Sequence, residues 1–382
     1  MPKRVVIAGG GTGGHLYPGI ALARAFKKHD KDMEITFVGT RRGIESKILP
    51  KEGFPLKTIW SAGLLGKKGL ARWLAWFKLP LGIVQSLGFL MSKRPHLVVG
   101  VGGYVSGPLV FSAWLLRIPI LIQEQNAIPG VTNRWLGKIS GQVAVSFAES
   151  KRFFPKGKTV ETGNMIREEF CTPRVTAASQ PGERFQILVV GGSQGAHAIN
   201  RAMLDALDHL SGKKNLLHII HQTGAEDFEW VQKQYGEKGF SAEVQPFIHG
   251  LAGQYSRVSL VICRAGASTV AEITACGKAA ILIPFPHAAH NHQERNARIL
   301  AEADAGEMIL EKDLSGGRLA QSIARAMENP DRLREMGENS YRLGRRDATQ
   351  KVLELCLQLM GTHPAGSRKN GDSGGKYALS CF

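Results

Sequence analysis

Short apolar runs rich in β-branched residues alternate with helix-length segments along this chain, and this alternation limits its fold more than any other feature. Residues 4–8, 34–39, 96–101, 118–123 and 142–145 have the continuous apolar character of strands buried on both faces. The segments between them are long enough for crossover helices, which is typical of parallel βαβ units. This part of the chain therefore predicts a doubly wound α/β domain.

The alternation stops at residues 171–184, a Pro-, Ser- and Thr-bearing linker, and then begins again. Runs at residues 185–190, 217–221, 242–245, 259–263 and 280–284 predict a second parallel sheet. We therefore expect two Rossmann-like, doubly wound domains facing across a cleft. The boundaries we predict are residues 1–163, residues 164–344, a helix at about 345–360 that packs back on the first domain, and a disordered tail at 361–382.

Four glycine-rich or small-residue segments each follow a predicted strand and open a predicted helix. They are GGGTGGH (9–15), GGYVSGP (102–108), GGSQGA (191–196) and CRAGASTVAE (263–272). Small residues let the backbone approach an anion, and a helix N-terminus offers free N–H groups and a positive dipole end. Any one segment alone could be a tight turn without a ligand. Their division between two domains favours a phosphate-bearing ligand held from both sides.

The first of these segments also fits GxGxxG, but the match is weak as a dinucleotide signature. The following strand ends in Gly39, Thr40 and Arg41, without the acidic residue that holds the ribose of NAD. This opposes NAD and leaves an NADP-dependent oxidoreductase as an alternative. In the fourth segment, Glu272 is placed either to accept hydrogen bonds from ribose hydroxyls or only to stabilise a helix N-terminus.

The net charge of +17 lies almost entirely within residues 1–163, which predicts contact with an anionic surface, either nucleic acid or acidic lipid. The five cysteines are scattered, which favours a reducing compartment and opposes a structural zinc. The N-terminus runs directly into a strand, so no secretory signal is expected. The longest apolar stretch, residues 79–91, is too short to span a bilayer.

Nine motifs taken together resemble the MurG family of peptidoglycan glycosyltransferases. They are GGGTGGHLYPG, GTRRGIE, GGYVSGP, QEQNAIPGVTNRWL, GNMIR, GGSQGA, HQTG, CRAGASTVAE and NHQERNA, in order between Val5 and Leu359. The resemblance implies the GT-B fold. It also implies inverting transfer of N-acetylglucosamine from its UDP donor to the C4 hydroxyl of lipid-linked N-acetylmuramyl-pentapeptide. The expected location is the cytoplasmic face of the plasma membrane, as a peripheral protein without a cofactor.

The resemblance also implies roles for individual residues. From the first domain, Thr12, Gly13, Gly14 and Asn126 would contact the sugar and phosphates. From the second domain, the UDP-sugar would be held by Arg167, Ser193, the backbone of Ile248, Gly266, Ala267, Ser268, Thr269, Val270, Ala271, Glu272 and Gln293. Three positions depart from the usual pattern: Gln123 replaces a common His, Met165 replaces a common Pro, and His292 stands where Gln sometimes occurs.

The reaction needs a base to accept the hydroxyl proton, and His15 is the first candidate and Glu124 the second. The triplet from Asp30 to Asp32 lies in a polar turn away from every glycine loop, so we expect no metal site. Two other enzyme classes remain possible: a UDP-sugar epimerase on the same fold and the NADP-dependent oxidoreductase. A non-enzymatic lipid-binding protein would not explain the CRAGASTVAE segment.

Tryptophan and basic residues gather in residues 64–80, a pattern typical of a segment at a membrane interface. The alternative is that these tryptophans cap an ordinary core, and Pro80 predicts a break in the helix. A membrane-embedded acceptor favours contact with anionic phospholipid, and no nucleic-acid module is recognisable. The residues we predict at this surface are Arg72, Trp73, Trp76, Lys78, Leu79, Trp114, Trp135 and Lys138.

Overall fold

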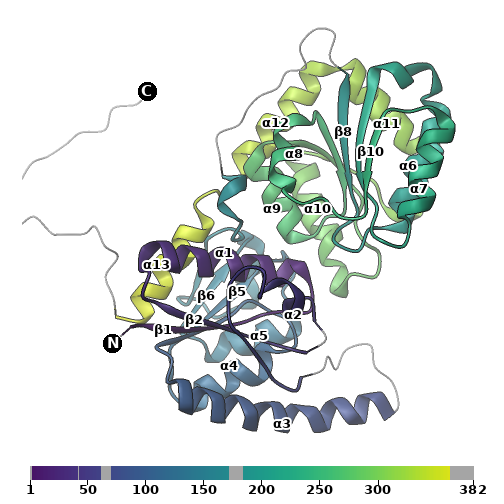
Figure 1. Ribbon diagram of the computed structural model, residues 1–382. Helices are drawn as coiled ribbons and strands as arrows, with labels where there is room; N and C mark the ends of the chain where they lie inside the picture. The colour runs from purple at the N-terminus through teal and green to yellow at the C-terminus, as the bar shows by residue number, and fades with distance from the viewer. Residues whose placement is uncertain (1, 42, 62–69, 172–183, 362–382) are drawn as a thin grey trace, which may run out of the picture.

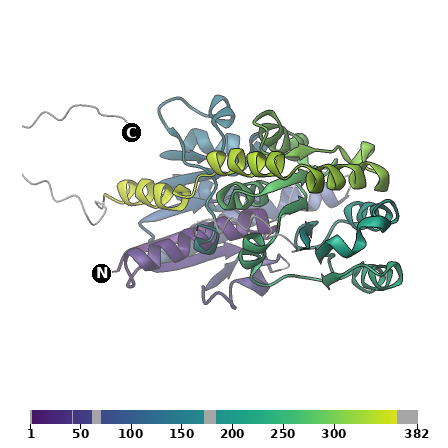
Figure 2. The ribbon, with the colours of Figure 1, turned by 90° about the horizontal axis from the view of Figure 1, so that it is seen from above.

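The computed structural model describes residues 2–41, 43–61, 70–171 and 184–361, and for residues 70–78 it describes the backbone alone. Within these ranges the chain forms two parallel sheets, each covered by helices on both faces (Figure 1 and Figure 2). This confirms the predicted class of two doubly wound α/β units.

The first sheet has seven parallel strands in the order β3-β2-β1-β4-β5-β6-β7. They are β1 (Arg4–Ala8), β2 (Glu34–Gly39), β3 (Leu56–Thr58), β4 (Leu97–Gly100), β5 (Ile120–Glu124), β6 (Gln142–Val145) and β7 (Thr159–Glu161). One face carries α1 (Gly13–His29) and α2 (Glu45–Ile48), and the other carries α3 (Leu70–Lys93), α4 (Ser106–Leu115) and α5 (Val131–Ile139). Side chains alternate along β1. Val5 and Ile7 therefore pack in the core beneath α1, and Val6 and Ala8 pack in the core beneath α4 on the opposite face of the sheet.

The second sheet has six parallel strands in the order β10-β9-β8-β11-β12-β13. They are β8 (Phe185–Val190), β9 (Leu217–Gln222), β10 (Ala242–Gln245), β11 (Leu260–Cys263), β12 (Ala279–Leu282) and β13 (Glu307–Met308). Helices α6 (His197–His209), α7 (Phe228–Lys238) and α11 (Gly316–Glu328) cover one face. Helices α8 (Leu251–Arg257), α9 (Ala267–Cys276) and α10 (His292–Glu302) cover the other, and α12 (Pro330–Leu343) packs beside α9.

The last helix, α13 (Ala348–Leu359), returns to the first sheet. Its buried face, with Val352, Cys356 and Leu357, joins the core that α1 forms over β1 (Figure 1). The N-terminal and C-terminal parts of the described chain therefore share one hydrophobic core.

Helix α1 begins at Gly13, so the motif residues Gly13, Gly14 and His15 form its first turn. A different helix departs from the sequence prediction. Helix α3 continues through Pro80, and the predicted break was wrong. A proline inside a helix costs about 3 kcal/mol. Packing on α4 offsets this cost, because Leu90 is buried and Ser112 Oγ donates to the Ile83 carbonyl at 3.2 Å.

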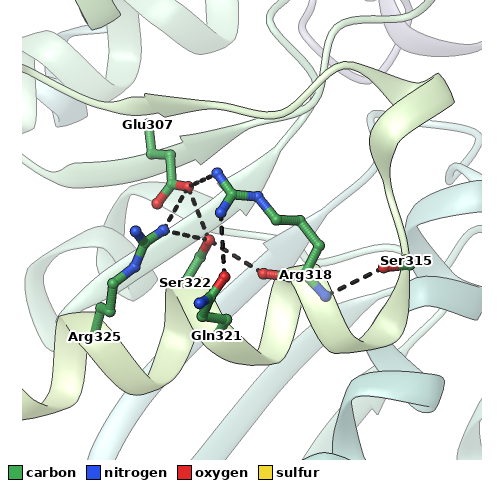
Figure 3. A network of polar contacts seen from close by, with 6 residues as sticks. All are labelled: Glu307, Ser315, Arg318, Gln321, Ser322 and Arg325. Carbon is green, nitrogen blue, oxygen red and sulfur yellow. Dashed lines mark hydrogen bonds and ion pairs between the residues drawn. The ribbon is translucent and has the colours of Figure 1, made fainter.

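A carboxylate at the edge of the second sheet fixes α11 (Figure 3). Glu307 on β13 accepts hydrogen bonds from Arg318 at 2.9 Å, Ser322 at 2.8 Å and Arg325 at 3.0 Å. The hydroxyl of Ser315 caps the same helix by accepting from the Arg318 N–H at 3.2 Å. This network is structural: it holds the far edge of the sheet and contributes no side chain to the site described next.

Candidate active site

The glycine loop after β1 is held in place by a buried carboxylate. Glu45 is 0% exposed and accepts from the Gly11 N–H at 2.9 Å and from the N–H and hydroxyl of Thr40 at 2.8 and 2.9 Å. A Cβ atom at Gly10 would lie 2.5 Å from the Glu45 side chain, so this position requires glycine. Glu45 belongs to the GTRRGIE motif, but nothing in the pattern of that motif indicated that this residue supports the neighbouring loop.

His15 lies in the first turn of α1 and faces the loop after β4. A Cβ atom at Gly102, whose φ is +97°, would lie 2.6 Å from His15 Nδ1, so the second glycine motif makes room for this imidazole. Burial lowers the pKa of His15 below its ordinary value of 6.5, although a hydrogen bond to Gln125 opposes the shift. The ring is therefore neutral at pH 7.

Hydrogen bonding fixes which ring nitrogen of His15 carries the proton. The side-chain NH₂ of Gln125 donates to the Val101 carbonyl at 2.6 Å and to Gln123 Oε1. Gln125 Oε1 therefore faces His15 Nδ1 at 3.3 Å as an acceptor, and Nδ1 must be the protonated nitrogen. The lone pair of the neutral ring is then on Nε2, the nitrogen that can accept a proton.

Gln123, the residue that replaces a common His, continues this buried polar chain. Its Nε2 donates to Asn164 Oδ1 at 3.1 Å, and Asn164 Nδ2 lies 3.5 Å from Ser268 Oγ on α9. A glutamine at this position thus supports the Gln125 side chain that orients His15.

Glu124, the second candidate base, is 1% exposed with both oxygens occupied. One oxygen accepts from the N–H and the side chain of Asn126 at 2.9 and 3.2 Å, and the other accepts from Asn133 at 2.8 Å and the Gly130 N–H at 3.3 Å. Burial raises the pKa of Glu124, and these hydrogen bonds oppose the shift. This geometry suits a residue that holds the loop from 124 to 133 in place. Because both oxygens of Glu124 are already occupied, it favours His15 as the base.

The N-termini of α1 and α9 meet between the two sheets. Pro18 has no N–H to pair with the Gly14 carbonyl four residues earlier, and Ser268 Oγ donates to that carbonyl instead, at 3.2 Å. Thr12 and Gly266 are the N-cap residues of the two helices, and both have extended backbones. Gly13 and the segment from Ala267 to Ala271 thus form the first turns of helices from different sheets, with the small side chain of Thr269 half-buried.

Arg167 and Glu272 form a charged pair beside this junction. Arg167 Nη2 lies 3.5 Å from Glu272 Oε1, and the guanidinium stacks on the rings of Tyr17 at 4.9 Å and Phe170 at 4.8 Å. Burial raises the pKa of Glu272 to about 7, although the charge of Arg167 opposes the shift. A second carboxylate also faces this guanidinium, because Arg167 Nη1 lies 3.2 Å from Glu169 Oε1.

Met165 is buried in the core between the first sheet and α13, at 1% exposure. Arg167, two residues later, begins a short 3-10 helix (Glu168–Phe170) as its N-cap. Met165 therefore anchors this segment by packing, which is how the chain presents Arg167 without the common proline.

The remaining predicted donor-site residues lie on three loops of the second sheet. Ser193 is exposed in the loop after β8, and the buried Ile248 follows β10. Gln222 connects these loops, because its Nε2 donates to the Gly192 carbonyl at 2.7 Å and its Oε1 accepts from the Ile248 N–H at 2.9 Å. Gln293 Oε1 accepts from the Phe285 N–H at 3.0 Å. Gln222 was not predicted as a site residue, although its HQTG motif was noted.

No group of acidic, histidine and cysteine residues with the geometry of a metal site occurs within the described residues. The Asp30–Asp32 pair forms a polar turn in which the Asp32 N–H donates to Asp30 Oδ1 at 2.9 Å.

Comparison with known proteins decides the family. Residues 5–145 match the glycosyltransferase family 28 N-terminal domain, and residues 186–352 match the glycosyltransferase family 28 C-terminal domain. A Myxococcus xanthus protein named UDP-N-acetylglucosamine--N-acetylmuramyl-(pentapeptide) pyrophosphoryl-undecaprenol N-acetylglucosamine transferase is 48% identical over 94% of this chain and 93% of its own length. The crystal structure of Acinetobacter baumannii MurG superposes with a TM-score of 0.75 and 32% identity, covering 94% of this chain and all of that one. The chain belongs to the MurG family.

Membership in the MurG family confirms the resemblance, the GT-B fold and the assignment as a UDP-N-acetylglucosamine-dependent glycosyltransferase. It also places the first glycine loop in a glycosyltransferase domain, which removes the oxidoreductase alternative. A UDP-N-acetylglucosamine 2-epimerase structure superposes with a TM-score of 0.67 at 13% identity, over 98% of this chain and all of that one. At that identity the likeness shows the fold alone.

Proposed function

We propose that this MurG-family chain transfers N-acetylglucosamine from UDP-N-acetylglucosamine to the C4 hydroxyl of lipid-linked N-acetylmuramyl-pentapeptide, with inversion, in peptidoglycan synthesis. The hydroxyl oxygen bonds to the anomeric carbon as the bond from that carbon to the diphosphate breaks. The electron pair leaves with UDP, and the hydroxyl proton passes to a base on the protein.

The meeting of α1 and α9 is the observation that carries this proposal. Two helix N-termini from different sheets converge where Ser268 donates to the Gly14 carbonyl at 3.2 Å. Free N–H groups and the positive ends of both helix dipoles favour a diphosphate at this point. Arg167 adds a formal positive charge nearby. Such preorganised donors stabilise the charge that develops on a leaving diphosphate.

The remaining assignments follow from the geometry of the same junction. We assign the base to His15 Nε2, since Nδ1–H is committed to Gln125 and the ring is neutral at pH 7. For the nucleoside, we assign the carbonyl of Ile248 to the uracil, because the N–H of Ile248 already donates to Gln222. We assign Glu272 to the ribose hydroxyls.

A transfer assay with labelled UDP-N-acetylglucosamine and the lipid-linked acceptor tests the function directly. We expect label in the lipid product only when the acceptor is present, together with release of UDP. Accumulation of UDP-N-acetylmannosamine without acceptor would instead show an epimerase and contradict the proposal.

Removing the Glu272 carboxylate is expected to weaken donor binding. A charge-assisted hydrogen bond to ribose contributes about 1–3 kcal/mol, so Glu272→Ala should lose roughly fivefold to 150-fold in UDP-N-acetylglucosamine affinity at pH 8. Because ribose hydroxyls donate more strongly to the ionised carboxylate, and its pKa is raised to about 7, wild-type affinity should rise between pH 6 and 8. Titration calorimetry at several pH values measures both effects.

Glu272→Gln is the matched variant, since it keeps the shape but cannot ionise. We expect it to bind donor with little dependence on pH across the same range. Equal pH dependence in wild type and Glu272→Gln would show that another group titrates and would remove the ribose role.

The outer face of the first unit, formed by α3, α4 and α5, is the membrane contact we propose. Exposed apolar side chains gather there, with Val84 at 65%, Trp114 at 45% and Trp135 at 66% exposure. Phe111 packs on Trp114 at 5.6 Å, and Lys138 Nζ lies 4.4 Å from the Trp135 ring. Tryptophan rings beside cations are suited to the headgroup layer of an anionic membrane.

The other predicted membrane residues lie on α3, which runs along this outer face (Figure 1). Leu79 is half-buried, and the side chains of Arg72, Trp73, Trp76 and Lys78 fall outside those described. No helix within the described ranges is long and apolar enough to cross a bilayer. We therefore propose peripheral association of this face with anionic phospholipid at the cytoplasmic side of the inner membrane.

Placing a negative charge on this face should weaken membrane binding without affecting catalysis. We expect Trp114→Glu to lower affinity for vesicles containing acidic phospholipid by about tenfold or more, because it removes an apolar anchor and adds repulsion. Turnover with a short-chain, water-soluble acceptor should be unchanged. Vesicle sedimentation measures the membrane affinity, and a transfer assay with the water-soluble acceptor measures turnover. Trp230→Glu, at a 39% exposed tryptophan on α7, is the control and should bind vesicles like the wild type; equal losses in the two variants would exclude a specific membrane face.

A further inference from the structure

One fully buried asparagine on α10 connects the two units at the site. Asn296 is 0% exposed and belongs to the NHQERNA motif, for which the sequence suggested no role beyond Gln293. Its Oδ1 accepts from the Ala127 N–H at 3.1 Å, and its Nδ2 donates to the Ala265 carbonyl at 3.1 Å. Ala265 immediately precedes Gly266, the N-cap of α9. A single carboxamide thus joins the loop after β5 to the loop that opens α9.

The third contact of Asn296 fixes the orientation of Asn126. Asn296 Nδ2 donates to Asn126 Oδ1 at 3.4 Å, while Asn126 Nδ2 donates to Glu124 Oε1 at 3.2 Å. The two ends of the Asn126 amide therefore cannot be exchanged: its oxygen faces Asn296, and its NH₂ faces the opposite way. The second hydrogen of that NH₂ is the group that half-buried Asn126 can present to a substrate oxygen.

A separate ion pair also connects the two units nearby. Arg295, the neighbour of Asn296, donates to Glu149 Oε2 through Nε at 2.7 Å and makes a second bond through Nη2. Both side chains are about one-third exposed, at 32% each. This pair holds the two units together without contacting Asn126. Breaking it therefore tests the docking of the units separately from the orientation of the Asn126 amide.

We propose that Asn296 is a positioning residue for transfer: it sets the Asn126 amide so that an N–H points at the donor sugar or phosphate, and only while the two units are docked. The inference rests on the proposed function, because it needs a donor held between α1 and α9. Its consequence is that the first unit completes its donor contact through a residue of the second. Catalytic geometry is thereby assembled by docking rather than by either sheet alone.

Asn296→Asp tests this role. An aspartate still accepts from the Ala127 N–H, but it presents an oxygen to Asn126 Oδ1 and to the Ala265 carbonyl, where a donor is required. We expect kcat for transfer to fall about tenfold to a hundredfold, while affinity for UDP, which lacks the sugar, changes less than about twofold. Asn126→Ala should lower kcat in the wild type but have little further effect in the Asn296→Asp background, since the two changes remove one function.

Arg295→Gln is the matched control, since it breaks a contact between the units at the adjacent position and should keep kcat within about twofold. Hydrogen exchange at the Ala127 amide should be protected in the wild type and in Asn296→Asp and faster in Asn296→Ala, which shows that the loop is folded in the aspartate variant. Additive losses from Asn126→Ala and Asn296→Asp, or an equal loss in Arg295→Gln, would overturn the inference about Asn296. Absence of transfer by the wild type would instead overturn the proposed function.

Discussion

Replacing His15 with alanine is expected to lower kcat by roughly two to four orders of magnitude, the usual contribution of a positioned general base. The imidazole is neutral, and Gln125 fixes its proton on Nδ1, so Nε2 is prepared to accept the hydroxyl proton. Affinity for UDP should change little, because this role is exercised only during transfer. Steady-state kinetics with the lipid-linked acceptor, together with a UDP titration, measures both quantities.

The pH dependence of the wild type gives an independent reading of the same role. A base must be unprotonated, and burial lowers the pKa of His15 below 6.5. At saturating donor, where the ionisation of Glu272 no longer limits binding, kcat should therefore stay high as the pH falls through 6.5 and drop only below it, with the acid limb absent in His15→Ala. His29→Ala, at the exposed far end of α1, is the control and should behave like the wild type. A His15→Ala variant that loses UDP affinity as strongly as kcat would identify His15 as a phosphate ligand rather than a base.

Replacing Arg167 with methionine should lower kcat by about a hundredfold to a thousandfold, comparable to the loss of one preorganised donor to a developing anion. The guanidinium lies over the rings of Tyr17 and Phe170, so it is oriented before the donor binds. Arg167→Lys keeps the charge but not the planar fork and should recover only part of the rate.

A second measurement separates charge stabilisation from simple packing by Arg167. Its positive charge opposes the rise in the pKa of Glu272, so Arg167→Met should raise that pKa above about 7. Donor binding in the variant should then become stronger with pH over a higher range than in the wild type. If kcat and the pH dependence both stay at wild-type values, Arg167 has no part in stabilising the leaving diphosphate.

The prediction of two doubly wound units followed from strand patterns that were strong along most of the chain. Strands β1, β2, β6 and β8 lie at the predicted residues, because buried parallel strands are continuous apolar runs. The short edge strands β3, β7 and β13 escaped prediction, since two or three residues with partial burial have no distinct pattern. The continuity of α3 through Pro80 was not predicted for another reason: packing on α4 outweighs the local tendency of proline to break a helix.

By itself, the sequence determined the family, the fold and the glycine loops, because these depend on local patterns and on motifs that lie in order along the chain. The tertiary structure decided which polar groups meet. The tautomer of His15 and the position of Asn296 between Asn126 and Ala265 depend on hydrogen bonds between residues far apart in sequence, and the occupied oxygens of Glu124 depend on how the loop after β5 folds back on that strand. Such bonds have strict requirements of distance and direction, and only the tertiary packing brings donor and acceptor together.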